Sequence, residues 1–510
     1  MGGTAAAATA LGLTRANAVD PPQVTFAAKD VEFSSWNGDI LAVAVTENDL
    51  QPGSDSKFHF HNAILKKLDG QLGGLLSAAA AEEDFTGKPG QLVVLRVQGQ
   101  AFKRVALISF VAHNARCLQG LGESVTSLAK AAQATSAAIV LASPSVIQEE
   151  LRLNAAAPIA SGMVLGLHED NRYKSECKKV HLKQVDLIGL GSGPEVDQKL
   201  KHANHVSSGV ILARDLVNSP ANVLTPAALA EEASNIASTY SDVLMATILD
   251  AEKCRELKMG AYLAVAAASA NPPHFIHLCY RPTGGNVKRK LAIVGKGLTF
   301  DSGGYNIKAV PVATIELMKW DMGGSAAVFG AAKALGQIKP PGVEVHFIAA
   351  ACENMISGTG MRPGDIVTAS NGKTIEVDNT DAEGRLTLAD ALVYACNQGV
   401  DKIIDLATLT GSMRVALGPS IAGEKFWRLP MEESYWEDMK SSIADMLNTG
   451  PMQPKGGAIT AALFLKRFVD ERVQWMHIDI AGTVWSHKKR GATGFGVATL
   501  VEWVLKNSSP

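Results

Sequence analysis

The sequence predicts an α/β protein of two domains: a smaller N-terminal α/β domain, then a larger C-terminal domain whose mostly parallel sheet is flanked by helices. Three observations predict this fold class. Short apolar runs typical of strands alternate with helical segments in the first part of the chain. The run Gly191-Ser192-Gly193-Pro194 then breaks this pattern. Beyond it, repeated strand-loop-helix units indicate a mostly parallel sheet.

The first domain is expected over residues 24–195, after a flexible or targeting segment at 1–23. Residues 122–132 and the region of 78–82 are expected to be helical. The expected strands are 92–97, 105–110, 138–142 and 185–190. A connecting helix is expected over 196–218. This domain carries no recognisable chemistry of its own.

The second domain is expected over residues 219–510, and its most informative stretch is Asn379-Thr380-Asp381-Ala382-Glu383-Gly384-Arg385-Leu386. The run 374–377 before it alternates like a half-buried strand, and 386–396 after it has the period of a helix. The two acids therefore lie on a strand-to-helix connection, where side chains converge outside the carboxyl end of a strand. Two nearby carboxylates repel each other unless a cation lies between them. Taken alone, the stretch is equally consistent with a solvated loop that carries a chance charge cluster.

Two further segments place charged residues beside glycines. Residues 292–308 read AIVGKGLTFDSGGYNIK, where a buried strand is expected to end before a glycine-rich loop that carries Lys296, Asp301 and Lys308. Asp321 precedes a helix of small residues expected over 325–335. Oxygen ligands without histidine suit Mg²⁺ or Mn²⁺, although Zn²⁺ also accepts carboxylates. Two cations that share these carboxylates would form a two-metal hydrolytic site.

These segments resemble those of the leucyl aminopeptidases, the dinuclear metallopeptidases of the cytosol aminopeptidase family, and look closest to the plant members. NTDAEGRL matches the family's signature octapeptide, and VGKGLTFDSGGYNIK and DMGG match its two other site segments in order. The resemblance covers about residues 24–507, and three ordered matches are far more specific than a lone glycine-rich loop. It implies a catalytic C-terminal domain with two divalent metal ions per subunit, Mn²⁺ first, with Zn²⁺ or Mg²⁺ as alternatives. Two such ions lower the pKa of a bound water, which becomes a nucleophile near neutral pH.

The resemblance assigns roles to seven residues at matching positions. The implied metal ligands are Lys296, Asp301, Asp321, Asp381 and Glu383, and the implied catalytic residues are Lys308 and Arg385. As a ligand, Lys296 must be neutral, and two adjacent cations would lower its pKa. Lys308 would polarise the scissile carbonyl and stabilise the developing oxyanion. In the family, the counterpart of Arg385 holds a bicarbonate that carries a proton to the leaving amine.

The chain departs from the family at one place. Members of the family have a further loop and helix before the segment equivalent to residues 424–430, whereas Gly423 here runs directly into Glu424. None of the seven site positions is lost, so we expect an intact site in a chain that is less stable or less well assembled. An error in the coding sequence would also remove this segment from the amino-acid sequence. Asp378, just before the octapeptide, could perturb the site or point to solvent.

Composition fits an ordinary soluble enzyme. The chain has 510 residues, with 48 basic and 50 acidic side chains and a net charge of −2, which argues against nucleic acid as an obligate partner. No run of 18 apolar residues predicts a membrane helix. The six cysteines lack CxxC spacing and are expected to be reduced thiols.

Residues 1–19 lack acids and weakly resemble the end of a transit peptide. Because plant members are often plastid-targeted, the chloroplast is the expected location, with the cytoplasm as the alternative.

The expected function is that of a metal-dependent aminopeptidase, which hydrolyses the N-terminal bond of peptides with a free N-terminus and prefers Leu-like residues, in intracellular peptide processing and turnover. The resemblance also implies a homohexamer. Two alternatives stay open. One is a catalytically weak relative with a chaperone-like or binding role, which the missing segment motivates. The other is a nucleic-acid-binding relative, against which the near-neutral charge argues.

Overall fold

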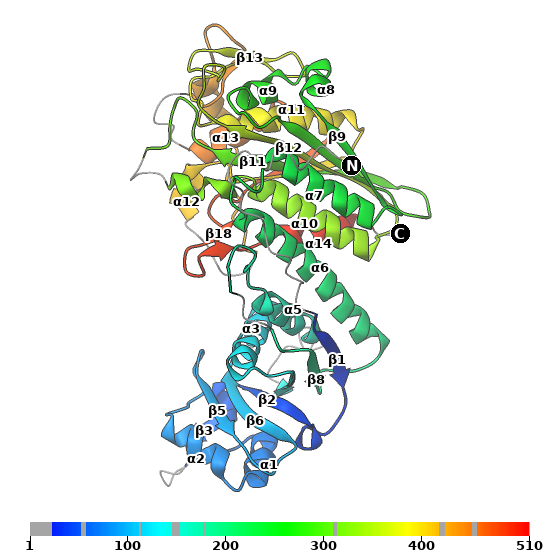
Figure 1. The fold of residues 1–510 in the computed structure, drawn as a ribbon, viewed down its shortest axis with the longest axis vertical. Coiled ribbons are helices and arrows are strands. Elements are labelled where there is room, and N and C mark those ends of the chain that lie inside the picture. The colour runs from blue at the N-terminus through cyan, green and yellow to red at the C-terminus, as the bar shows by residue number, and fades with distance from the viewer. Residues whose placement is uncertain are drawn as a thin grey trace. The chain divides into compact units, whose positions relative to one another are not determined.

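The computed structural model describes residues 23–52, 58–111, 114–144, 154–176, 180–309, 314–417, 424–450 and 456–508. The chain divides into two compact units between Ser207 and Ser208, within helix α6 (Pro194–Asn218), and Figure 1 shows the elements of both. The expected domain boundaries at 195/196 and 218/219 fall on either side of this division and stay predictions. The segment 1–23, except Gln23, and Gly423 at the predicted junction lie outside the described residues.

The N-terminal unit is built on a six-stranded sheet in the order β1-β8-β7-β2-β6-β5, in which β5 and β6 are antiparallel and the other neighbours are parallel. Its strands are β1 (Thr25–Lys29), β2 (Gly38–Val45), β5 (Leu92–Arg96), β6 (Phe102–Ser109), β7 (Ser136–Leu141) and β8 (Gln184–Ile188), with a short hairpin of β3 (Leu50–Pro52) and β4 (Phe58–Phe60). Its helices are α1 (Ala63–Gln71), α2 (Leu75–Glu82), α3 (Ala115–Ala132) and α5 (Ala156–Leu167). Each expected strand and helix is found here, although α3 begins at Ala115, well ahead of the expected start at 122, and β1, β2, α1 and α5 were not predicted.

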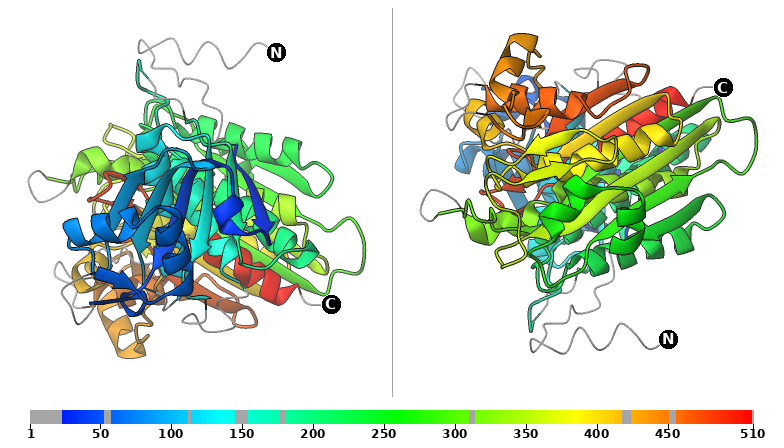
Figure 2. Two further views of the ribbon diagram at one scale, coloured as in Figure 1. Left: turned by 90° about the horizontal axis from the view of Figure 1, so that it is seen from below. Right: turned by 90° about the horizontal axis from the view of Figure 1, so that it is seen from above.

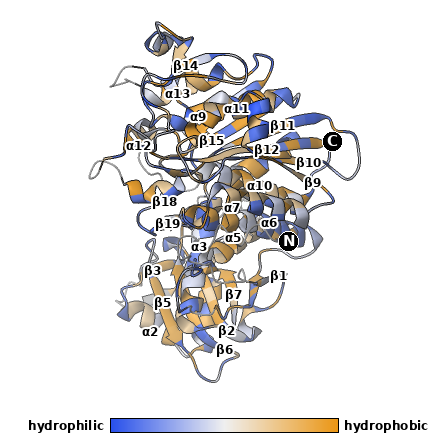
Figure 3. Ribbon diagram, turned by 45° about the horizontal axis from the view of Figure 1, so that its top comes forward, coloured by the Kyte–Doolittle hydropathy of each residue, from blue (hydrophilic) through white to orange (hydrophobic). Residues whose placement is uncertain are grey.

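Helices cover both faces of this sheet because β2 is apolar on both sides. Ile40 and Ala42 belong to a core cluster with residues of α3 and α5, whereas Leu41 and Val43 belong to a second cluster with residues of α1 and α2. Alternate residues of a strand point to opposite faces, so a continuous apolar run such as that of β2 requires cover on each side. Figure 3 shows β2 largely in the hydrophobic colour.

The C-terminal unit is built on a second six-stranded sheet in the order β17-β15-β11-β12-β10-β9, parallel from β17 to β12 and antiparallel across β10 and β9. This confirms the expected mostly parallel sheet. The strands are β9 (Leu244–Leu249), β10 (His274–Tyr280), β11 (Arg289–Asp301), β12 (Val343–Asn354), β15 (Lys402–Ala407) and β17 (Gln474–Asp479). A small sheet of β13 (Ile366–Thr368), β14 (Thr374–Glu376) and β16 (Met446–Leu447) and a hairpin of β18 (Trp485–Ser486) and β19 (Gly491–Ala492) complete it.

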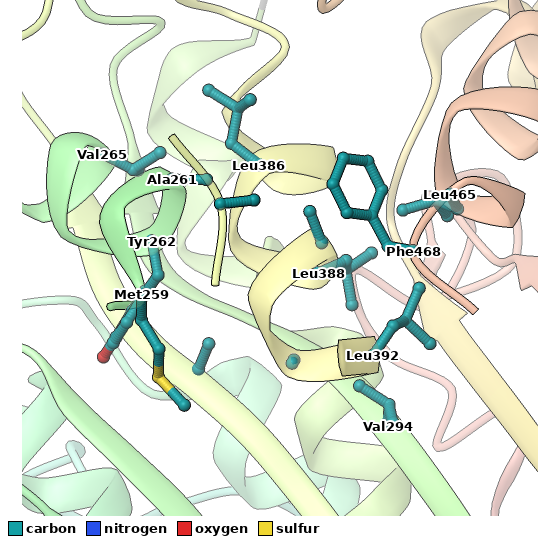
Figure 4. Close-up of a cluster of buried hydrophobic side chains, with 14 of the residues drawn as sticks. Met259, Ala261, Tyr262, Val265, Val294, Leu386, Leu388, Leu392, Leu465 and Phe468 are labelled. Atoms are coloured by element: carbon teal, nitrogen blue, oxygen red, sulfur yellow. The ribbon is translucent and has the colours of Figure 1, made fainter. Parts of the chain in front are cut away.

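Helices flank both faces of the second sheet as well (Figures 1 and 2). One face carries α7 (Pro226–Thr239), α10 (Gly323–Ile338) and α14 (Val497–Asn507), and the other carries α9 (Gly260–Ala266), α11 (Glu383–Asn397) and α13 (Gly457–Lys466). The short helices α8 (Ala251–Glu256) and α12 (Gly411–Leu417) lie at the edges. Figure 4 shows the core beside α11, where Leu388 and Leu392 project from one side of the helix toward Val294 and Phe468. This packing fixes the start of α11, where the octapeptide lies.

Candidate metal centre

The predicted site residues gather at the carboxyl ends of the central strands. Asp301 is the last residue of β11, and Glu383 is the first residue of α11, which follows the short strand β14. Asp321 lies between a 3-10 helix (Ile315–Trp320) and α10. Asp301, Asp381 and Glu383 place carboxylate oxygens within 4.8 Å of one another. The structure thus brings together acids that are up to 82 positions apart in the printed sequence.

One element differs from the prediction. The glycine-rich loop expected after Val294 is instead a continuation of β11, so Lys296 and Asp301 lie on the strand, and only Lys308 lies in the loop beyond it. Gly295 suggested a loop, but it is needed for packing: a Cβ there would lie 2.6 Å from the backbone of Ser325 in α10. A glycine inside a strand often marks such a close approach of another backbone.

Lys296 lies inside a group of acids. Its Nζ is 2.7 Å from Asp321 Oδ2 and 2.9 Å from Glu383 Oε1, and it donates to the carbonyl oxygen of Thr408 at 3.1 Å. A Cβ on Gly384 would lie 2.5 Å from Lys296 Cε, so the glycine of the octapeptide makes room for this side chain. Thr408 Oγ1 also donates to Asp321 Oδ1 at 2.7 Å, which orients that carboxylate.

Lys308 joins the other two acids. Its Nζ is 2.8 Å from Asp301 Oδ2 and 2.5 Å from Asp381 Oδ1. Asn354, the last residue of β12, donates from Nδ2 to Asp301 Oδ1 at 2.9 Å and to the carbonyl oxygen of Thr380 at 3.0 Å. Each lysine therefore contacts one pair of the four acids, and two positive charges face four carboxyl groups.

Three carboxylate oxygens at this centre are buried and have no aligned hydrogen-bond donor among the described residues: Asp321 Oδ2, Asp381 Oδ1 and Glu383 Oε2. The lysine nitrogens approach the first two within ion-pair distance but not along a hydrogen-bond direction. Buried carboxylates are normally saturated by donors or bound to metal ions. Orphaned oxygens of this kind, together with an amine, suit a hard divalent cation, so the residues fit the dinuclear metal site that the resemblance implies.

Mutual repulsion and burial disturb the protonation of the acids. Burial and the neighbouring carboxylates raise the pKa of Asp381 to about 7 and raise that of Asp321 well above its usual range. Burial alone would lower the pKa of Lys296 and of Lys308, but the surrounding carboxylates outweigh it and raise both. Without bound metal, Lys296 is therefore protonated, contrary to the neutral form that a ligand requires. Two cations would have to displace that proton.

Arg385 lies in the first turn of α11 and is buried. Its Nη1 donates to the backbone carbonyl of Asn448 at 2.7 Å, and its guanidinium lies 6.0 Å from the ring centre of Phe464. Its Nε has no hydrogen-bond partner among the described residues. Burial lowers the pKa of Arg385 to about 10, with Glu383 opposing that shift, so the group remains a cation at neutral pH.

Four neutral residues that hold these charges in place were not among the predicted site residues, although one of them belongs to the octapeptide. They are Asn354, Thr380, Thr408 and Asn448, each of which hydrogen-bonds to a predicted site residue or to the loop that carries it. A signal for two of them was present, because Asn354 ends β12 and Thr408 follows β15, at the strand ends where sites form in parallel sheets. Nothing in the local sequence around Asn448 marked it.

Comparison with known proteins agrees with this geometry. The N-terminal domain of the cytosol aminopeptidase family matches residues 42–177, and its catalytic domain matches residues 211–501. The chain belongs to the cytosol aminopeptidase family. As a member of that family it is a metal-dependent aminopeptidase of the plant leucine aminopeptidase type.

Two curated relatives and a solved structure document this membership. "Leucine aminopeptidase 2, chloroplastic" of Oryza sativa subsp. japonica is 77% identical over 100% of this chain and 89% of that protein. The protein of the same name from Arabidopsis thaliana is 66% identical over 98% of this chain and 89% of its own length. A mutant of tomato leucine aminopeptidase is 59% identical, has a TM-score of 0.90, and aligns over 98% of this chain and 99% of that one.

These comparisons also bear on the alternatives. High identity to leucine aminopeptidases over the whole length does not favour the catalytically weak relative. The alignment with the rice protein spans 537 positions against the 510 residues of this chain, so this family member lacks residues that the rice protein has. Among the described residues, no helix is long and apolar enough to cross a membrane.

Proposed function

We propose that Lys296, Asp301, Asp321, Asp381 and Glu383 hold two divalent metal ions, and that Lys308 and Arg385 act on the substrate. The observation that carries this proposal is the set of buried carboxylate oxygens without aligned donors, with two lysine ammonium groups among them. Mn²⁺ is the metal we expect first, and Zn²⁺ or Mg²⁺ would also accept this ligand set.

When bound, the two ions supply Lewis acidity and a nucleophile at neutral pH. Lys296 would lose its proton to donate a lone pair, and metal loading would neutralise the four acids that now pair with lysines. Lys308, released from its two carboxylates, would donate to the scissile carbonyl oxygen as negative charge develops there. Arg385 would hold an anion at its unpaired Nε, and a bicarbonate there would carry a proton to the leaving amine.

The proposed substrates are peptides with a free N-terminus and a Leu-like first residue, cleaved during peptide processing and turnover. We further propose a chloroplast location, since the rice and Arabidopsis relatives are named chloroplastic, and a homohexameric assembly. The proposed domains are 24–195 and 219–510, the latter carrying the metal site, with 196–218 as the connection between them.

The test uses metal-stripped protein with Mn²⁺, Mg²⁺ or Zn²⁺ added back, and Leu-p-nitroanilide as substrate. Activity should vanish on chelation and return with Mn²⁺ or Mg²⁺. The matched control is the same substrate with an acetylated amine, which should not be cleaved. Full activity in protein that metal analysis shows to be free of divalent ions would overturn the proposed site.

A further inference from the structure

Asn448 lies where two short strands end side by side. β16 pairs in parallel with β14, and the backbone N–H of Asn448 extends that pairing by donating to Glu376 O at 3.0 Å. The residue is completely buried. The backbone of the small sheet therefore helps to set its position.

The side chain of Asn448 spans the loop that carries the octapeptide acids. Its Oδ1 accepts from the backbone N–H of Asp378 at 3.0 Å and of Asn379 at 3.2 Å. Its Nδ2 donates to Asn379 O at 2.7 Å and to Ala382 O at 3.4 Å. One amide thus holds both sides of Thr380-Asp381, and Ala382 directly precedes Glu383. A primary amide offers an acceptor and two donors on one planar group, which a carboxylate or a hydroxyl cannot match.

The same residue also holds Arg385, through its backbone. The carbonyl oxygen of Asn448 accepts from Arg385 Nη1 at 2.7 Å. The next residue adds a further tie, because Thr449 donates from its N–H and its Oγ1 to Asp378 Oδ1 at 3.0 and 2.7 Å. Asp378 is half-buried, and its negative charge opposes the lowering of the pKa of Arg385, so it does act on the electrostatics of the site. Through its bonds with Thr449, Asp378 connects the start of the octapeptide loop to the segment that follows β16.

We propose that Asn448 is a positioning residue that fixes, with one side chain and one carbonyl, both the loop bearing Asp381 and Glu383 and the guanidinium of Arg385. This inference rests on the proposed roles of those three residues. Partners that orient metal ligands commonly matter nearly as much as the ligands themselves. Asn448 thereby couples metal affinity to the orientation of the cation expected to hold the anion.

The first test compares Asn448→Asp with Asn371→Asp. Asn448→Asp keeps the shape but turns the two donors into an acceptor that faces the carbonyls of Asn379 and Ala382. Asn371 is exposed, and its Oδ1 accepts from Lys373 N, a bond that aspartate preserves. Titration calorimetry with Mn²⁺ should show affinity lower by about 10-fold or more in Asn448→Asp, and parent-like affinity in the control. Equal affinities in all three proteins would overturn the role in the metal loop.

The second test asks whether the side chain of Asn448 affects Arg385 indirectly, by fixing the position of the backbone carbonyl that holds its guanidinium. At Mn²⁺ concentrations that fill the site by metal analysis, Asn448→Asp should still lower kcat by about 10-fold, with a smaller change in KM. In an Arg385→Ala background the same substitution should cost less than about 3-fold, because residues that act through one another are not additive. Full additivity would overturn the coupling to Arg385.

A milder variant keeps the proposal testable if Asn448→Asp does not fold. Thr449→Val removes the Oγ1 bond to Asp378 and keeps the shape, so it should lower Mn²⁺ affinity by about 3-fold to 10-fold at an unchanged melting temperature. An unchanged Mn²⁺ affinity in a folded Thr449→Val protein would contradict the proposal that this segment positions the metal-binding loop. A parent chain that is inactive with every added metal would instead overturn the proposed function, so the two failures are distinguishable.

Discussion

The Nζ of Lys296 lies 2.7 Å from Oδ2 of Asp321, and each side chain is at most 5% exposed. An ammonium and a carboxylate buried this deeply stabilise each other's charge, and the surrounding acids raise the pKa of Lys296. The ion pair therefore joins two of the residues that we propose as metal ligands. Metal binding at the proposed site would exchange protons for metal ions.

This exchange predicts that metal affinity rises with pH. Because Lys296 is protonated before loading and must be neutral as a ligand, each binding event should release a proton. Mn²⁺ affinity measured at pH 6.5, 7.5 and 8.5 should increase at each step, and calorimetry in buffers of different ionisation enthalpy should detect the released proton. Lys296→Met serves as the control for the lysine proton, since only the protons held by Asp321 and Asp381, whose pKa values are raised, would remain to be released. Affinity independent of pH in the parent protein would contradict the prediction.

The division of roles between ligands and catalytic residues predicts two different defects. Lys308→Ala should lower kcat by about 10²-fold, the usual cost of losing a group that stabilises an oxyanion, while metal content stays near that of the parent. Asp381→Ala should lose metal. Lys253→Ala, at an exposed lysine paired with Glu256, controls for loss of a lysine in general. Equal metal loss in the two site variants would show that the roles are wrongly divided.

A buried histidine in the middle of β10 predicts a stability loss in acid. His277 Nε2 contacts His346 Nδ1 at 2.8 Å and its Nδ1 contacts Tyr394 Oη at 3.1 Å. Burial lowers the pKa of His277 to about 4. In the unfolded chain the pKa is about 6.5, so the unfolded state takes up a proton first as the pH falls. Stability is fully present above pH 6.5 and should decline toward pH 4 by up to about 3 kcal/mol.

The check on this prediction is the melting temperature of the parent and of His277→Gln between pH 7.5 and 4.5. The parent should lose melting temperature more steeply below pH 6.5 than the variant does. His346, whose pKa burial also lowers, is present in both proteins. Parallel curves would mean that His277 does not titrate on unfolding in this range.

The junction before Glu424 predicts a chain that is less stable than its relatives. Val415 and Trp427 flank this region and are 89% and 75% exposed. Burying two or three such side chains would contribute about 1.5–3 kcal/mol each, against a net domain stability of about 5–15 kcal/mol. A version with the relatives' segment inserted should melt at a higher temperature and contain more hexamer by mass measurement. Equal melting temperatures and equal hexamer fractions would show that the segment is dispensable.

Glu424 itself offers a contrast within the same region. Its Oε1 accepts from Gly496 N at 2.7 Å and its Oε2 from Thr499 N at 2.8 Å, so it caps the start of α14. Glu424, the first residue after the junction, therefore attaches the chain to the start of α14. Any instability should arise from the uncovered apolar side chains, and Glu424→Ala should lower the stability of both versions by the same amount.

The sequence by itself determined the fold class, the family and the identity of the charged residues at the candidate site. Periodicity located β14 and α11 around the octapeptide, because period two and period 3.6 are local properties of a chain. Asp381, Glu383 and Arg385 were identifiable because their chemistry is concentrated within five consecutive residues. The local elements and the octapeptide need only neighbouring residues, and the family needs only the order of three segments along the chain.

Only the tertiary structure decided how those charges are held. Gly295 suggested a loop, yet it lies in β11 because α10 passes against it, a contact with residues 30 positions away. Asn448 reaches the octapeptide loop across about 70 positions, since β16 pairs with β14. Such partners carry no local pattern: an amide or a carbonyl becomes a positioning group only when the fold brings it to a loop whose backbone donors and acceptors need partners.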